Sequence, residues 1–400
     1  MPRSRTRRAV LAAALGALLL AGCAEPEPGL QVEVSGASRS GGTADASVPP
    51  GGDGSTVPRL PPICAPPKPG RTYDTAQLNA TMTQLDLPDW RAADVGATAP
   101  LTDGRVLWVF GDTLRAAGSR PGLVANSLLV SSGTCFTQVG AGRDTALLGV
   151  PEDGEACWPT SVASRAVIGG DEAFVICSRV QRKPAGLLDF SYLGASLIRI
   201  TVASGGQPVI RDVTSLTPDT HDETVVNWGA GQLIDGGWLY VYGSQQGRGA
   251  TSKSVLVARV RLAQASRFMA WQFYDGRRWQ EDAGWARPVL PANPGVSQAF
   301  SVHRDGNHFV LVSKRGGEFG DAIGVWTAPT PAGPWSLASQ TPYPYDDGSG
   351  FVSYQPLAHP ELPLRNGRLL VTMSRNPTSF ENLLAQPRRG RPVFVEVPKP

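Results

Sequence analysis

Two aspartates near the start of the folded region could form a pair of carboxyl groups. Asp112 directly follows the apolar run Leu107 to Gly111, and Asp94 lies 18 residues earlier. Counting outward from the Asp103-Gly104 turn places Asp94 opposite position 113, one residue from Asp112. Two carboxyl groups this close cannot both ionise freely, so one should have a raised pKa. A proton donor beside a charged carboxylate is the chemistry that cleaves a glycosidic bond.

Each aspartate alone has a simpler interpretation. Asp112 could cap the end of a strand, and Asp94 could head its strand as a solvated loop residue. Together they favour catalysis, and Gly111 would let a ligand approach closely. In each of the four later hairpins, the strand that corresponds to the one before Asp112 is followed by serine, so only the first hairpin has an acid there. These serines are Ser178, Ser244, Ser313 and Ser374.

A third carboxylate could come from Glu223 or Glu361, although Glu223 could be a solvated turn residue and Glu361 a buried structural acid inside a strand. Sugar rings pack against aromatic planes, and amides and guanidinium groups bind hydroxyls, so such side chains would suit a neutral carbohydrate. Any one of Trp108, Trp158, Trp228 and Trp326 could instead be core. The candidate substrate-binding residues are Trp158, Asn227, Trp228, Gln298, Tyr354, His359, Arg375 and Asn376.

The charge balance and the histidines exclude several other functions. The chain has 37 Lys and Arg against 34 Asp and Glu, which argues against a nucleic-acid surface. The four histidines are scattered in sequence, although His221 and His359 could meet. We therefore expect no metal and no cofactor, and we expect a monomer.

A hairpin pattern recurs five times and predicts an all-β fold. Each copy has an apolar strand, a glycine-containing turn and a second strand rich in Val, Leu and aromatic residues. The turn glycines Gly104, Gly170, Gly236, Gly306 and Gly367 are 66, 66, 70 and 61 residues apart. Units of this length, each with room for two more strands, predict a five-bladed β-propeller.

A propeller brings the heads of the first strands and the tails of the second strands to one face, where a pocket should form. The fifth unit is short. We expect either the segment Arg391 to Val397 or a strand near Tyr73 to Leu85 to close the ring.

The N-terminus predicts export. Arginines precede the apolar run Ala9 to Leu20, which is too short for a membrane span. The run ends in Leu20-Ala21-Gly22-Cys23, which resembles a bacterial lipobox, so we expect residues 1–22 to be a lipoprotein signal peptide and Cys23 to carry the lipid. An ordinary signal peptide with an incidental cysteine is the alternative.

Residues 23–70 are rich in Pro, Gly, Ser and Thr and are interpreted as a flexible linker, which leaves 71–400 as the propeller domain. The four remaining cysteines are Cys64, Cys135, Cys157 and Cys177. In an exported protein they predict two disulfides with three possible connectivities, and Cys64 could pin the linker to the domain. A zinc site is the alternative, although no Cys-x-x-Cys spacing supports it.

Several motifs resemble a known family. They are Asp94-Val95-Gly96, the run Asp103 to Thr113, His359-Pro360-Glu361-Leu362 and Ser374-Arg375-Asn376. They look like domain of unknown function 4185, which is classed with glycoside hydrolase family 183. The resemblance implies a five-bladed propeller and endo-acting hydrolysis of D-arabinan, the furanoside polymer of mycobacterial-type cell walls. It also implies that the two essential acids are Asp94 and Asp112.

The sequence thus predicts a glycoside hydrolase that is lipid-anchored outside the bacterial cell membrane and acts on a neutral, arabinan-like wall polysaccharide. Its only contact with the membrane would be the N-terminal lipid. The alternative is a non-catalytic propeller that binds or senses wall carbohydrate. Such a protein would have no need for the Asp94 and Asp112 pair.

Overall fold

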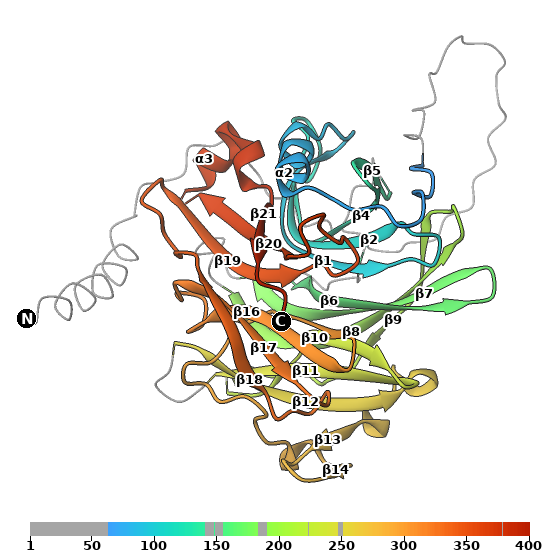
Figure 1. Cartoon of the computed structure of the whole chain (residues 1–400), viewed down its shortest axis with the longest axis vertical. Helices are drawn as coiled ribbons and strands as arrows, with labels where there is room; N and C mark the ends of the chain where they lie inside the picture. The colour runs from blue at the N-terminus through green and yellow to red at the C-terminus, as the bar shows by residue number, and fades with distance from the viewer. Residues whose placement is uncertain are drawn as a thin grey trace, which may run out of the picture. The chain divides into compact units, whose positions relative to one another are not determined.

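The computed structural model describes residues 63–140, 148, 155–182, 190–222, 224–246, 251–377 and 379–400. Their strands form five antiparallel sheets, the blades of a β-propeller (Figure 1). The predicted all-β, five-bladed fold is therefore confirmed. The predicted signal peptide, Cys23, linker residues 23–62 and Glu223 lie outside the described residues.

The first two blades follow the predicted hairpins. Blade one contains β1 (Trp90–Pro100), β2 (Val106–Arg115), β4 (Ser127–Ser132) and β5 (Cys135–Gln138), with β3 (Leu123–Val124) paired to β2. Blade two contains β6 (Glu155–Val167), β7 (Gly170–Arg182), β8 (Phe190–Ala203) and β9 (Pro208–Ser215).

The remaining blades differ in their outer strands. Blade three contains β10 (Asn227–Asp235), β11 (Trp238–Gln246), β12 (Lys253–Arg261), β13 (Gln272–Tyr274) and β14 (Trp279–Gln280). Blade four contains β15 (Ser301–Asp305), β16 (His308–Arg315), β17 (Ala322–Ala328) and β18 (Ser336–Pro342), and blade five contains β19 (Phe351–Ala358), β20 (Leu369–Pro377) and β21 (Val393–Val397). The helical segments are α2 (Thr75–Gln84), η1 (Leu262–Gln264), η2 (Phe268–Ala270), η3 (Ala283–Trp285), α3 (Phe380–Ala385) and η4 (Pro387–Gly390).

The first strands of four blades carry irregularities near their N-terminal ends. In β1 the pairing with β2 shifts on both sides of Val95, which has a φ of 67°. Shifts occur at similar positions in β6, β10 and β19. Bulges of this kind bend a strand and redirect its side chains. They therefore change which side chains reach the face where the first strands begin.

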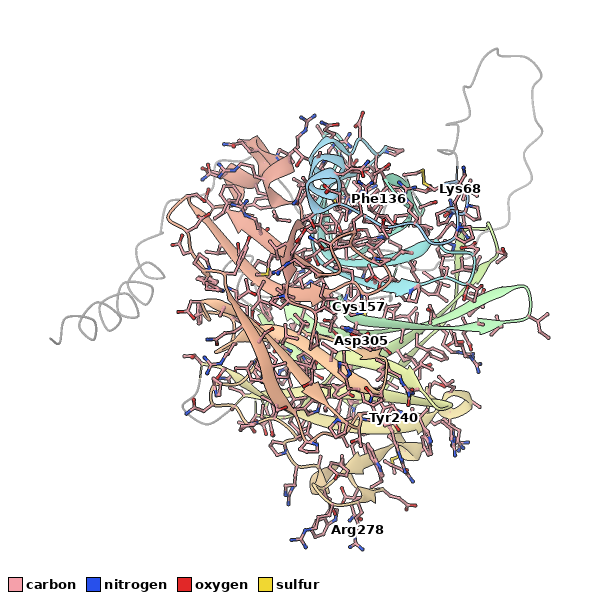
Figure 2. All side chains as sticks on the ribbon, viewed as in Figure 1. Lys68, Phe136, Cys157, Tyr240, Arg278 and Asp305 are labelled. Carbon is pink, nitrogen blue, oxygen red and sulfur yellow. A yellow bond between two sulfur atoms is a disulfide. The ribbon has the colours of Figure 1, made fainter. Side chains whose placement is uncertain are left out.

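Blade five is closed by β21, as one of the two alternatives predicted. The other alternative is wrong, because Thr75–Gln84 forms the helix α2 rather than a strand. Asp74 caps this helix by accepting the N–H of Gln77, and Leu78 and Met82, one turn apart, are buried. These two residues join a core cluster against which Phe136 packs, and α2 lies beside β21 (Figures 1 and 2).

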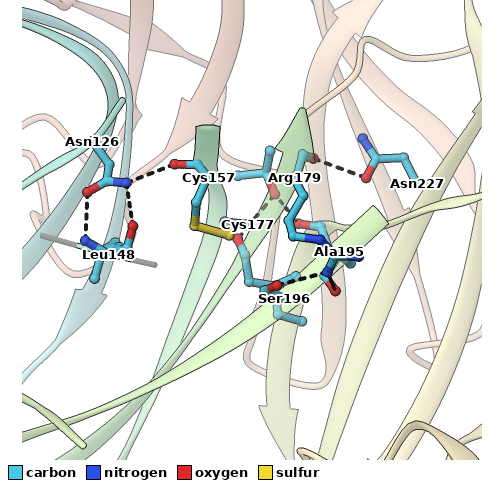
Figure 3. Close-up of a disulfide and its surroundings, with 12 residues drawn as sticks. Asn126, Leu148, Cys157, Cys177, Arg179, Ala195, Ser196 and Asn227 are labelled. Atoms are coloured by element: carbon cyan, nitrogen blue, oxygen red, sulfur yellow. Dashed lines mark hydrogen bonds between the residues drawn. A yellow bond between two sulfur atoms is a disulfide. The ribbon is translucent and has the colours of Figure 1, made fainter. Parts of the chain in front are cut away.

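Two disulfides form, as predicted, and the structure selects one of the three connectivities. Cys64 pairs with Cys135 of β5, so the end of the predicted linker is pinned to blade one. Cys157 and Cys177 join β6 to β7. Beside the second disulfide, the Asn126 amide donates to the Cys157 carbonyl at 2.9 Å (Figure 3). Disulfides persist in oxidising compartments, so the domain belongs outside the cytoplasm.

Candidate active site

Asp94 and Asp112 face each other across β1 and β2. Ala93 pairs with Thr113 and Val95 pairs with Phe110, so Asp94 lies opposite Gly111 and Asp112. The structure therefore brings the two aspartates together, although the pairing differs by one residue from the count across the turn, because position 113 pairs with Ala93 rather than with Asp94. Neither lies at a strand end, however, because β1 begins at Trp90 and β2 continues to Arg115.

Both strands extend past the aspartates because their pairing continues beyond the bulge. Trp90 pairs with Arg115 and Ala92 pairs with Leu114. The bulge itself is held from blade five, since the Ser374 hydroxyl accepts the N–H of Val95 at 2.9 Å. The backbone is thus held on both sides of Asp94, at Ala93 by pairing with Thr113 and at Val95 by Ser374.

Gly111 makes room for Asp94 rather than for a ligand. A Cβ atom on Gly111 would collide with the Asp94 carboxyl oxygen Oδ1 and lie 3.1 Å from the Val95 side chain. The expectation of close ligand approach at this glycine is therefore wrong. The missing side chain instead lets the Asp94 carboxyl lie against the strand that carries Asp112.

Blade five supplies the hydrogen-bond partners of Asp94. The Tyr354 hydroxyl donates to Asp94 Oδ2 at 2.9 Å, and the Asn376 amide in turn donates to the Tyr354 oxygen. Oδ1 of Asp94 is buried and has no hydrogen-bond partner among the described residues. A lone charged oxygen in that position would be costly, which favours a proton on this carboxyl group.

Blade two supplies the partners of Asp112. The Trp158 indole N–H donates to Asp112 Oδ1 at 2.9 Å, and the Arg182 guanidinium forms an ion pair with the same oxygen. Arg182 also lies 5.7 Å from the centre of the Trp158 ring, and Phe190 packs edge-on against that ring. Trp158 therefore belongs to the candidate site. Trp108 and Trp326, by contrast, are buried in the core.

The two carboxyl groups differ in charge. Burial, and then the negative charge of Asp112, raises the pKa of Asp94 to about 7. Burial also raises the pKa of Asp112, but Arg182 and the Trp158 hydrogen bond oppose that rise. Burial and the charge of Asp94 raise the pKa of Tyr354, so this phenol keeps its proton and donates. Asp112 thus ionises first, and Asp94 stays protonated to near-neutral pH.

The serines that correspond to Asp112 have a structural role. Three of the four bond to a residue in, or just before, the first strand of the next blade: the pairs are Ser178 with Asn227, Ser244 with Gln298 and Ser374 with Val95. Ser313 bonds instead to Ser297 within its own blade. In blade one the equivalent contact to the next blade is the bond from Trp158 to the Asp112 carboxylate.

Glu318 is a carboxylate close to this site that the sequence analysis missed. It follows β16, and its Oε1 accepts the backbone N–H of Gln298 at 2.5 Å. Burial raises the pKa of Glu318. Its charge contributes to the raised pKa of Tyr354, so it lies within electrostatic range of the tyrosine that binds Asp94. Its position just after the tail of the fourth second strand was the available signal.

Arg182 was also missed, because it lies beyond the predicted tail of the strand. That tail was placed at Cys177, whereas β7 continues to Arg182. The long hairpin of β6 and β7 therefore carries a cation towards blade one that a five-residue strand would not. The only signal in the sequence was that polar and apolar residues continue to alternate after Ser178, which indicates a longer strand.

Several predicted binding residues lie elsewhere. Trp228 is 4% exposed and packs on Phe273 with ring centres 5.3 Å apart, so it belongs to the core of blade three. Asn227 is buried against Ser178. Gln298 touches the site region through its backbone N–H, which binds Glu318.

His359 and Glu361 form a separate buried network towards the other end of β1. His359 bonds to Thr98 at 2.6 Å and to Thr372 at 2.7 Å, and Thr98 also donates to Glu361. The prediction that His359 reaches the mouth, where it could meet His221, is therefore wrong. Glu361 is the buried structural acid that was the alternative, although it follows β19 rather than lying inside a strand.

A cavity between the five blades does not contain the aspartate pair. It has a volume of about 380 Å³ and is lined by the first strands of all five blades, beyond their irregularities. Thr98, His303 and Glu361 are among its residues. The two carboxyl groups of the candidate site lie outside this cavity.

Neither a metal site nor a membrane span is found in the described part of the chain. No group of three or more His, Cys, Asp or Glu side chains there could hold a metal ion. No helix among the described residues is long and apolar enough to cross a membrane.

The described strands form a five-bladed β-propeller in which two carboxyl groups face each other across β1 and β2. The chain belongs to the family described as Domain of unknown function (DUF5005), whose model matches residues 76–399. The family suggested by the motifs, domain of unknown function 4185, is therefore not the one to which the chain belongs. That suggestion rested on short motifs, concentrated in blades one and five. None of the curated proteins matches the chain.

Solved structures resemble the chain at low sequence identity, and the first of the three that follow shares its fold. A protein of Bacteroides ovatus described as a candidate hydrolase is 16% identical with a TM-score of 0.58, over 82% of this chain and 92% of that one. The GH43_1 enzyme of Xanthomonas citri is 13% identical with a TM-score of 0.44, over 81% and 92%. An exo-1,5-α-L-arabinanase from a bovine ruminal metagenomic library is 12% identical with a TM-score of 0.40, over 78% and 94%.

Proposed function

We propose that the protein is an extracytoplasmic glycoside hydrolase that cleaves an arabinan-like cell-wall polysaccharide. The observation that carries the proposal is the unequal charge of two carboxyl groups on one hairpin. Asp94 holds a proton because its pKa is raised to about 7, while Arg182 and Trp158 favour the charged form of Asp112. A protonated and an ionised carboxyl side by side are the two groups that glycoside hydrolysis requires.

In this proposal Asp94 is the general acid and Asp112 is the nucleophile. The Asp112 carboxylate attacks the anomeric carbon as the glycosidic C–O bond breaks, and Asp94 gives its proton to the departing oxygen. Asp94 then takes a proton from a water molecule that displaces Asp112 from the anomeric carbon. Both carboxyl groups return to their starting states.

The placement of the carboxyl groups favours retention of anomeric configuration. Asp94 has no directly opposed residue in the bulge, but it lies against Gly111, the residue before Asp112, and the charge of Asp112 contributes to its raised pKa. Retaining enzymes separate their carboxyl groups by about 5–5.5 Å, whereas inverting enzymes need about 6.5–9.5 Å to admit a water molecule. The hairpin geometry thus supports the shorter separation.

The surroundings suit a neutral sugar. Trp158 and Phe190 provide aromatic surface beside Asp112, and Tyr354 and Asn376 provide polar groups beside Asp94. Such a combination of ring faces and hydrogen-bonding groups binds sugar C–H faces and hydroxyls. D-arabinan, the substrate expected from the sequence, is the one to test first.

Anchoring by lipid at Cys23 completes the proposal. The two disulfides support a location outside the cytoplasm. With residues 1–22 as signal peptide and 23–70 as linker, the propeller of 71–400 would stand on the order of 35–40 Å from the lipid, as a flexible coil of that length does. The enzyme would then reach wall polysaccharide while remaining on the membrane.

The test compares the full chain with its Asp112→Asn variant on D-arabinan. We expect soluble oligosaccharides from the unmodified protein, intact polymer from the variant, and products that retain the anomeric configuration by ¹H NMR. Intact polymer from the unmodified protein, together with measurable binding, would reject the hydrolase and leave the non-catalytic carbohydrate-binding propeller. Equal cleavage by both proteins would reject Asp112 as the nucleophile.

A further inference from the structure

Four arginines gather around a second cavity that the proposed chemistry does not use. Arg375 belongs to β20, Arg388 and Arg389 belong to η4, and Arg391 follows η4. They line a cavity of about 190 Å³ together with α2 and the start of β21, and no aspartate or glutamate lines it. We call these four residues and their cavity the arginine pocket.

Little negative charge balances the arginine pocket. Arg388 and Arg389 are exposed, and neither forms an ion pair with a carboxylate within the described part of the chain. The nearest paired carboxylate is Asp347, 3.9 Å from Arg375, which is beyond hydrogen-bond distance. Nε of Arg375 is buried and has no partner among the described residues. The pocket therefore has hydrogen-bond donors and positive charge to spare.

Arg391 is buried, and within the described ranges it forms no ion pair with a carboxylate. It is 4% exposed and is held by backbone carbonyls: Nε donates to Arg91 at 2.7 Å, and Nη1 donates to Met82 at 2.7 Å. Burial and the charges of Arg388 and Arg91 lower its pKa to about 10. Positive charge is thus concentrated here, and the charge of Asp86 opposes it only in part.

An aromatic ring orders two of the arginines. The guanidinium of Arg389 lies 3.7 Å from the centre of the Phe351 ring, and that of Arg375 lies 5.2 Å from it. A guanidinium that stacks on a ring keeps the N–H groups at its edge available. Phe351 therefore holds both cations without occupying their hydrogen-bond donors.

The arginine pocket adjoins the aspartate pair through two chain segments. Arg375 precedes Asn376, whose amide donates to the Tyr354 oxygen that contacts Asp94. Pro392 lines the arginine pocket, and its Cγ would lie 3.8 Å from a Cβ placed on Gly96, two residues after Asp94. Arg375 and Asn376 point to opposite faces of β20, so the link through Pro392 and Gly96 is the one that places the arginine pocket near a sugar unit next to Asp94.

We propose that the arginine pocket binds an oxyanion, a phosphate or carboxylate group, carried by the polysaccharide next to the sugar that is cleaved. Guanidinium groups match the paired oxygens of these anions and bind them through two parallel hydrogen bonds. This inference rests on the proposed hydrolase function. It changes the expected substrate from a wholly neutral glycan to one with anionic substituents.

The first test measures binding of inorganic phosphate to the full chain by calorimetry at low salt. The variant Arg388→Gln/Arg389→Gln should bind phosphate at least about tenfold more weakly, since charged hydrogen bonds carry that much affinity or more. The matched control is Arg277→Gln/Arg278→Gln, an adjacent exposed pair in the outer turn of blade three (Figure 2). Equal affinities in all three proteins would overturn the inference. Such a result would mean that phosphate binds as an adventitious ion only. This titration involves no cleavage, so it is independent of the hydrolase proposal.

The second test asks what carries the anion. The Asp112→Asn protein, with and without the Arg388 and Arg389 substitutions, is titrated with D-arabinan that bears phosphate esters and with unmodified D-arabinan. We expect tighter binding of the phosphorylated polymer only while both arginines are present. Equal binding of both polymers would overturn the inference. Co-sedimentation with phosphatidylglycerol vesicles that depends on these arginines, without any preference among the polymers, would also overturn it and assign the site to a lipid headgroup.

Discussion

Asp94→Asn should stabilise the protein at alkaline pH and not at acid pH. Burial and the charge of Asp112 raise the folded-state pKa of Asp94 from 3.8 to about 7. Between these values the unfolded chain releases a proton that the folded chain keeps. The stability that Asp94 contributes is therefore complete below pH 3.8 and is lost as the pH rises through 7. Asparagine has nearly the same shape and no charge, so it removes this loss.

The size of the effect follows from the same values. Each tenfold change in an ionisation constant corresponds to about 1.4 kcal/mol, so moving a pKa from 3.8 to about 7 costs up to about 4 kcal/mol at pH 8. Some solvent access to the carboxyl reduces this, and about 2–4 kcal/mol is the expected gain in the free energy of unfolding. At pH 4 the gain should be below about 1 kcal/mol by the same reasoning.

The assay is urea denaturation of both proteins at pH 4 and pH 8, followed by tryptophan fluorescence. Asp275→Asn is a control of opposite sign, because hydrogen bonds from Gln280 and nearby backbone N–H groups lower the pKa of Asp275 to about 2. Its substitution should weaken the protein at pH 8. The same free-energy difference between Asp94→Asn and the unmodified protein at both pH values would refute the assignment of the proton to Asp94.

Three further predictions concern the neighbours of the pair and the disulfide that pins the linker. Arg182→Gln removes the cation that favours the charged nucleophile, so the acid limb of the pH–rate profile should move to higher pH; an unchanged limb would contradict that role. Gly111→Ala should lower kcat/KM at least about 100-fold, since the new methyl displaces the Asp94 carboxyl by about 1 Å. A stable variant with full activity would show that the space beside Gly111 is not needed to position Asp94. Cys64→Ser/Cys135→Ser should lower the free energy of unfolding, measured by denaturant titration, by about 4 kcal/mol, the loop-entropy value for a separation of 71 residues. A much smaller loss would show that other contacts hold the end of the linker.

The fold could be predicted because its signals are local and repeated. Each inner turn contains a glycine with positive φ, such as Gly104 at 84° and Gly306 at 59°, and each second strand is a run of buried apolar residues. What failed was the segment before the first blade. There α2 shows only two buried residues, Leu78 and Met82, so its amphipathic pattern is too weak to distinguish it from a strand.

The site could be predicted only as far as one hairpin reaches. Counting residues across a turn relates Asp94 to Asp112, because paired strands conserve register. Nothing in sequence relates Asp112 to Arg182 or Asp94 to Tyr354, since these contacts join different blades. The bulge at Val95 further changed the environment of Asp94, and it depends on Ser374, 279 residues away.

The position of Asp112 explains how one blade comes to hold both of the proposed catalytic residues. At this level of the propeller, the tails of three other second strands reach a residue of the next blade through a serine. In blade one the same contact uses a carboxylate, and Trp158 of blade two accepts the change by donating its indole N–H. A serine hydroxyl could make that contact but could not act as a nucleophile towards an anomeric carbon without an activating base. The aspartate therefore keeps the contact between blades and adds a charge, which in turn raises the pKa of Asp94. The aspartate at this contact thus adds its charge to the burial that already raises the pKa of Asp94.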